Sequence, residues 1–136
     1  MVKPIIKDTI FLSLKSEPAT KDDRNVMSDL VVTLKANANI CAGLAANMIG
    51  VNKRIIAVNT EVLIIVMNNP VITKKSGPYE TEEECLSLDG SRKTTRFQNI
   101  EVEYDDHYFN RKKEKFSGWI AEIIQHEVDH CNGILI

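Results

Sequence analysis

The chain has 136 residues, of which 43% are hydrophobic and 6% aromatic, and it carries a formal net charge of -2. This length suits one domain, so we expect residues 1–136 to form a single domain that buries roughly two thirds of its unfolded surface. The composition lacks the basic excess that phosphate backbones require, which argues against direct nucleic-acid binding.

The N-terminal residues do not resemble an export or membrane segment. Charged side chains at Lys3, Lys7, Asp8 and Lys15 interrupt the apolar run that a signal peptide needs. No segment approaches the roughly 18 apolar residues of a membrane helix. The three cysteines are irregularly spaced, which is typical of free thiols or metal ligands and not of a disulfide framework. We therefore expect a cytoplasmic protein without membrane contact.

The first half of the chain predicts one helix followed by a β-hairpin. Thr20 and Asp23 are spaced as in a capping box, and apolar residues then recur at helical intervals, which predicts a helix over residues 21–37. Small residues between two glycines predict a compact turn over 39–50. Two β-branched runs joined by a short polar turn predict a hairpin, formed by residues 54–59 and 62–68.

The second half predicts further strands. The sequence Ser-Gly-Pro-Tyr at 76–79 indicates a turn, and residues 81–88 and 99–106 alternate with the period of strands. Glu80 and residues 82–84 form an acidic cluster, for which a solvated strand face is the simplest interpretation. His107 falls in a charged stretch that indicates an exposed turn.

The last predicted element is a helix that begins near Ser117 and ends at Asn132 and Gly133, where glycine favours the left-handed cap conformation. At about 100° per residue, His126 and His130 both border the apolar face of this helix. A metal held by the two imidazoles would therefore lie inside the protein.

The segment His126-Glu127-Val128-Asp129-His130 has the H-E-x-x-H pattern that binds a divalent metal from one helical face. A catalytic site of this kind normally takes three protein ligands and leaves one position for water. A zincin-type metallopeptidase would take its third ligand C-terminal to this helix, but only six residues follow His130. The third ligand is therefore expected upstream.

Several upstream residues are candidates for this ligand. Cys131 points into the apolar stripe of the helix and His107 marks an exposed turn, so both are weaker candidates than Cys41 and Cys85. Cys85 lies in a predicted strand with one defined face, whereas Cys41 precedes a tight turn. The residues alone leave both cysteines open.

Three segments in order, GLAANMIG, EECLSLDG and QHEVDH, resemble the motifs of peptide deformylases, whose patterns are G-hydrophobic-G-L-A-A-x-Q, E-G-C-L-S and Q-H-E-x-D-H. The resemblance covers nearly the whole chain. It implies an α+β fold in which antiparallel strands surround a C-terminal metal-binding helix, with the N-terminal helix packed outside. It also implies that Cys85 joins His126 and His130 as the third ligand.

The same resemblance implies a metal-dependent hydrolase that removes the formyl group from N-formylmethionine on newly made polypeptides and releases formate. In the family the metal is usually iron(II), with nickel(II), cobalt(II) or zinc(II) able to substitute. Such an ion lowers the pKa of bound water towards about 7, and Glu127 would pass the water's proton to the leaving amine. Nascent chains as substrates imply proximity to the ribosome, and we expect a monomer.

The family stabilises the oxyanion with a backbone N–H, here that of Leu86, and with the side-chain amide of a glutamine. Met48 stands at the glutamine position and has no proton to donate. Loss of one such donor typically costs about 10²–10³ in rate. Glu84 also replaces the glycine of the second motif, and Cys131 replaces the leucine that follows the second histidine. The alternative is therefore a catalytically weakened relative that binds metal or formyl peptides without efficient turnover.

The resemblance also indicates substrate contacts. Gly43 and Leu44 would lie at the cleft edge, where an extended peptide pairs with backbone. Trp119 would form part of the wall for the methionine side chain, although a core tryptophan is an equally simple interpretation. Glu83 lies on the same strand face as Cys85 and would hold a metal ligand in place from outside the metal centre, with Arg96 as its partner. A surface ion pair between Glu83 and Arg96 is the simpler alternative.

Overall fold

The computed structural model describes residues 1–136 and contains one five-stranded sheet with the strand order β1-β2-β3-β4-β5. Each strand pairs antiparallel with its neighbours. The strands are β1 (Gly43–Ala45), β2 (Ile55–Asn59), β3 (Ile64–Cys85), β4 (Leu88–Asp105) and β5 (Arg111–Ser117). The helices are α1 (Thr9–Leu12), α2 (Arg24–Ala36) and α3 (Gly118–Cys131), with 3-10 turns η1 (Lys21–Asp23) and η2 (Ala46–Ile49).

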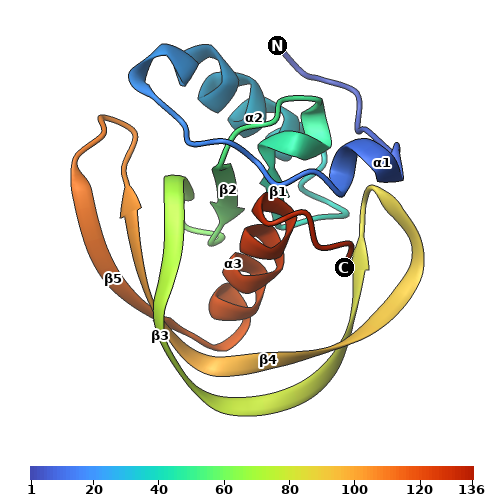
Figure 1. Cartoon of the computed structure of the whole chain (residues 1–136), viewed down its shortest axis with the longest axis vertical. Helices are drawn as coiled ribbons and strands as arrows, with labels where there is room; N and C mark the ends of the chain where they lie inside the picture. The colour runs from blue at the N-terminus through green and yellow to red at the C-terminus, as the bar shows by residue number, and fades with distance from the viewer.

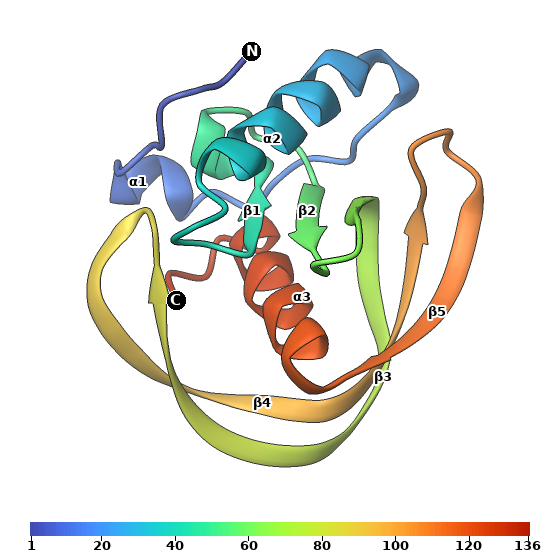
Figure 2. The ribbon, with the colours of Figure 1, turned by 180° about the vertical axis from the view of Figure 1, so that it is seen from behind.

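The long strands β3 and β4 curve around α3, as Figure 1 shows, and Figure 2 shows the same arrangement from behind. Helices α1 and α2 lie on the opposite side of α3 from this curved ribbon, near the N-terminus. The expected α+β architecture is therefore confirmed. None of the helices combines the length and the apolar character needed to cross a membrane.

The predicted first helix is confirmed, with its first turn in 3-10 form. The Thr20 N–H donates to Asp23 Oδ2 at 2.8 Å, and the Asp22 N–H donates to Thr20 Oγ1 at 3.2 Å, which is the reciprocal bonding of a capping box. Met27, Leu30 and Leu34 of the apolar stripe of α2 are fully buried. This stripe fixes α2 against the rest of the core.

The predicted hairpin is also confirmed as β2 and the start of β3, with Ile56 opposite Met67. Both side chains are fully buried, which explains the β-branched and apolar character of these strands.

The predicted turn at residues 76–79 is wrong, because β3 runs continuously through this segment. Its irregularities are absorbed within the strand: Gly77 has φ of 72°, and two register shifts lie between Asn68 and Lys74. Residues 69–85 pair with β4 alone, and proline is tolerated in a strand that has one unpaired edge. The long ladder with β4 outweighs the local turn signal.

The predicted strand over 81–88 is wrong at its end. β3 ends at Cys85, the chain reverses at Leu86 and Ser87, and Leu88 opens β4 opposite Cys85. The predicted strand over 99–106 is the second half of β4. Strand β5 lay in the charged stretch that carried no apolar alternation, as is typical of a charged edge strand.

Helix α3 begins after Ser117 and ends before Asn132, as predicted. Just after the helix, Gly133, which has φ of 75°, lies close to the backbone of the segment that follows α1. A Cβ on Gly133 would lie 2.4 Å from the carbonyl oxygen of Ser13. This contact makes glycine necessary just after the end of α3.

We expect Gly133→Ala to lower the free energy of unfolding by more than the about 1–3 kcal/mol of a left-handed non-glycine residue, since it also clashes with the Ser13 carbonyl. Urea unfolding measures this loss. The matched control is Gly90→Ala, because Gly90 has φ of 73° but no atom within 4 Å of its added Cβ. Equal losses in the two variants would show that the contact with Ser13 has no energetic weight.

Candidate metal centre

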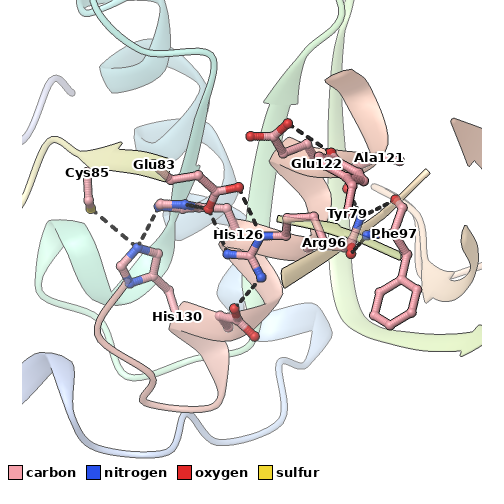
Figure 3. Close-up of polar contacts among 11 residues, drawn as sticks. Tyr79, Glu83, Cys85, Arg96, Phe97, Ala121, Glu122, His126 and His130 are labelled. Carbon is pink, nitrogen blue, oxygen red and sulfur yellow. Dashed lines mark hydrogen bonds and ion pairs between the residues drawn. The ribbon is translucent and has the colours of Figure 1, made fainter. Parts of the chain in front are cut away.

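Three side chains from distant parts of the chain converge beside α3. Cys85 is the last residue of β3, and His126 and His130 lie one turn apart on α3. Cys85 Sγ lies 3.3 Å from His130 Nε2, which lies 3.2 Å from His126 Nε2. Figure 3 shows the three side chains pointing towards one another. The structure thereby brings together the two histidines and only one of the candidate cysteines.

The donor atoms fit a four-coordinate divalent ion. With metal–nitrogen distances of about 2.0–2.1 Å and a metal–sulfur distance of about 2.3 Å, tetrahedral geometry places two nitrogens about 3.3 Å apart and sulfur about 3.6 Å from each nitrogen. The observed separations approach these values, and the three residues are at most 8% exposed. Three protein donors leave one coordination position for water or substrate.

The two histidines have opposite protonation tendencies. Burial lowers the pKa of His126, but hydrogen bonds to Cys85 and Glu83 outweigh this effect and raise it to about 10. Burial, together with the charge on His126, lowers the pKa of His130 to about 3. A metal ion bound here must displace the proton from His126, because metal ligands bind in their deprotonated form.

A buried ion-pair network supports His126 from behind (Figure 3). Glu83 Oε1 lies 2.8 Å from His126 Nδ1, and Arg96 donates to both oxygens of Glu83 at 2.7 and 2.9 Å. Arg96 also donates to Asp129 at 2.7 Å and is only 4% exposed, so this is not a surface ion pair. Burial raises the pKa of Glu83, but these partners outweigh it and lower it to about 2. The ionised Glu83 holds the ring so that Nε2 faces the metal position.

Glu127 differs from Glu83 in having no partner for its Oε1, although it is buried. Burial raises its pKa to about 7. A Cβ on Gly43 would lie 3.0 Å from Glu127 Oε2 and 2.7 Å from Ile123 Cγ2, so glycine at position 43 makes room for the carboxylate. The result is a buried carboxylate with one unpartnered oxygen beside the three converging side chains.

A cleft of about 520 Å³ opens onto these groups. Its walls are the segment 40–43 leading into β1, the end of β3 with its turn at 82–86, and one face of α3. Both strand segments present an edge that no other strand covers here: β1 pairs only with β2, and this part of β3 pairs only with β4.

Most of the residues assigned to the site from sequence border this cleft. Gly43, Met48, Glu83 and Leu86 line it together with Cys85, His126 and Glu127. The Met48 sulfur accepts the Ala45 N–H at 3.5 Å. Leu44 is fully buried and does not line the cleft. Trp119 is 48% exposed and also lies outside the lining, because it is in the first turn of α3, two turns before His126.

Two cleft residues on α3 were missed from sequence. Glu122 lies four residues before His126 and accepts a hydrogen bond from the Tyr79 hydroxyl at 2.9 Å, and Ile123 lies four residues before Glu127. Residues four positions apart lie on the same face of a helix, so the positions of His126 and Glu127 could have predicted that Glu122 and Ile123 also face the cleft.

Comparison with known proteins gives one consistent result. A family model described as polypeptide deformylase matches residues 3–136. A peptide deformylase from Clostridium beijerinckii is 60% identical over 136 residues, which cover the whole of both chains. A crystal structure of a class I type b peptide deformylase from Acinetobacter baumannii superposes with a TM-score of 0.90 at 30% identity, covering 99% of this chain and 97% of that one. Another structure from that organism, with Met-Ala-Ser bound, has a TM-score of 0.87 at 28% identity with the same coverage.

We expect Cys85→Ala to lose its metal during dialysis, because two imidazoles alone chelate weakly, whereas the native protein keeps about one ion per chain. Metal content by mass spectrometry measures this. Cys41→Ala is the matched control, since Cys41 also lines the cleft but lies outside the ligand group. A full metal complement in Cys85→Ala would move the third ligand to Cys41 or a carboxylate.

Proposed function

The chain belongs to the peptide deformylase family, whose members are metal-dependent hydrolases that remove the N-formyl group, and from this premise we propose how its residues perform that reaction. Cys85, His126 and His130 hold the metal, and Glu127 moves the proton. The observation that carries the proposal is the buried, unpartnered Glu127 carboxylate oxygen beside three converging ligands.

The metal is iron(II) in this proposal, with nickel(II), cobalt(II) or zinc(II) able to replace it. One thiolate and two imidazoles also suit zinc, so support for iron comes from family resemblance. When bound, the ion supplies Lewis acidity that lowers the pKa of water towards about 7 and polarises the formyl oxygen.

Glu127 accepts the proton of the water that attacks the formyl carbon. It then donates this proton to the amine nitrogen as the carbon–nitrogen bond breaks, which yields formate and a free N-terminus. Its raised pKa suits both roles, because a group that titrates near neutral pH both accepts and donates a proton readily. Glu83 acts through His126 and keeps the imidazole oriented.

The oxyanion is stabilised by the Leu86 N–H in the turn that follows Cys85. Leu86 lines the cleft, and no protein acceptor takes up its N–H. Met48 borders the same space without a proton to donate. The second donor of the family pattern is therefore missing, and the Leu86 N–H carries the protein's share of the stabilisation.

The peptide lies as an added strand between β1 and the end of β3. The Ala42 carbonyl accepts from the Asn59 N–H at 2.8 Å, so the alternation of an antiparallel ladder turns the backbone of Leu44 towards β2 and that of Gly43 towards the open edge. Gly43 then pairs with the substrate backbone, as in other complexes formed by strand addition. The methionine side chain faces α3 at Ile123.

The substrates in this proposal are N-formylmethionyl peptides on nascent chains. Such chains emerge at the ribosome, which places the protein in the cytoplasm and near the ribosome while it acts. In this proposal it works as a monomer, and one chain supplies all three proposed metal ligands and Glu127. The alternative of a weakened binding protein is not favoured, since a peptide deformylase is 60% identical over the full length.

We expect Glu127→Gln to keep the metal and to lower formate release from formyl-Met-Ala-Ser by about 10²–10⁴-fold, the usual contribution of a general acid–base group. The protein is purified without oxygen in the presence of iron(II), and formate is measured directly. The control is Glu61→Gln, which alters an exposed carboxylate in the loop before β3. Unchanged release by Glu127→Gln would mean that another base acts.

We expect Met48→Gln to raise the rate of formate release about tenfold or more, because it adds an amide donor beside the oxyanion. Met48→Leu separates this effect from repacking, since leucine adds no donor and should give no gain. A flat response to glutamine would show that the existing donors already satisfy the oxyanion.

A further inference from the structure

Acidic residues contribute to the walls of the cleft, and no lysine or arginine does. These acidic residues are Glu82, Glu83, Glu84, Glu122 and Glu127. A neutral peptide substrate does not require this surplus of negative charge, and the five carboxylates differ in whether they already have partners.

Three of the five carboxylates are accounted for. Glu83 is neutralised by Arg96, Glu122 accepts from the Tyr79 hydroxyl, and Glu127 is the proton acceptor of the reaction. Glu82 and Glu84 are exposed, and neither has a cation within 4.0 Å. On β4, Glu82 faces Lys93 and Glu84 faces Ser91, so no cation lies directly opposite Glu84.

Strand alternation separates these two residues from the metal ligands. Glu83 and Cys85 point towards α3, where they meet His126 and His130 (Figure 3). Successive side chains of a strand point to opposite faces, so Glu82 and Glu84 point away from α3. Their exposure, against the burial of Glu83 and Cys85, agrees with this arrangement.

A peptide strand added to this edge follows the same alternation. Its methionine side chain faces α3, so the second residue points to the outer face, where Glu84 and Glu82 lie. Side chains on adjacent strands that share a face lie about 4.5–5.5 Å apart at Cβ, within reach of a lysine or arginine. We propose that Glu84, assisted by Glu82, makes the protein prefer formylmethionyl peptides whose second residue is lysine or arginine; this inference rests on the function proposed above.

The expected effect is moderate, because exposed ion pairs contribute little and are screened by salt. Attraction of lysine and repulsion of glutamate act together, so we expect kcat/KM to be about three- to tenfold higher for the lysine peptide than for the glutamate peptide. The difference should lie mainly in KM and should shrink at high ionic strength.

The test compares formate release by the metallated protein from formyl-Met-Lys-Ser, formyl-Met-Ala-Ser and formyl-Met-Glu-Ser at low and high salt. The inference requires the order lysine, alanine, glutamate at low salt and a smaller spread at high salt. Equal kcat/KM for the three peptides overturns the inference while leaving the proposed function intact. No release from any of them overturns the proposed function, and the inference falls with it.

The double variant Glu82→Gln/Glu84→Gln assigns the preference to these residues. Its ratio of lysine to glutamate kcat/KM should fall towards one, whereas Asp89→Asn, which removes an exposed charge outside the cleft lining, should keep the native ratio. A preference that survives in the double variant would overturn the role of Glu82 and Glu84.

Discussion

The buried Glu83 carboxylate is the group on which the active centre depends. It joins three elements: its own strand β3, Arg96 of β4 and His126 of α3. Arg96 extends the connection to Asp129, one residue before the second histidine ligand. Removing one partner from such a network leaves an uncompensated buried charge, which is strongly destabilising. The same ion-pair network therefore both orients the histidine side chains and holds β3 and β4 against α3.

Glu83 and Glu127 show how environment divides the work between two buried carboxylates. Glu83 has three nearby donors, which lower its pKa and keep it ionised as a fixed support. Burial raises the pKa of Glu127 to about 7, and its Oε1 has no hydrogen-bond partner. Two buried carboxylates thus differ because one is hydrogen-bonded to cationic donors and the other is not, which suits the supporting and proton-transfer roles proposed for them.

The curvature of β3 and β4 creates the cleft as well as the candidate metal centre. The ribbon carries the end of β3 around α3 until it faces β1, and each of these segments keeps one unpaired edge at the cleft. An open edge is normally a liability in a sheet, but in the proposed function it pairs with the backbone of an extended peptide. In that proposal, strand alternation turns Glu83 and Cys85 of β3 towards the metal position, and Glu82 and Glu84 towards the peptide residue that follows the methionine.

The sequence by itself determined the local features, because these depend on residues close together in the chain. The capping box at Thr20, the spacing of His126 and His130 on one helical face, and the pairing of β2 with the start of β3 all follow from short-range periodicity. Motif resemblance added Cys85. The local signals failed where long-range pairing overrides them, as at Gly77 and Pro78, which lie inside β3, and in the charged residues of β5.

The tertiary structure decided which distant groups meet. It brought Cys85, which motif resemblance had already indicated, next to the histidines, placed Glu122 and Ile123 in the cleft, and left Trp119 outside it. It also gave Glu83 its partners and left Glu127 without one. These outcomes depend on how far β3 and β4 curve around α3, a quantity set by the whole ladder and its bulges, which no single segment of the chain encodes.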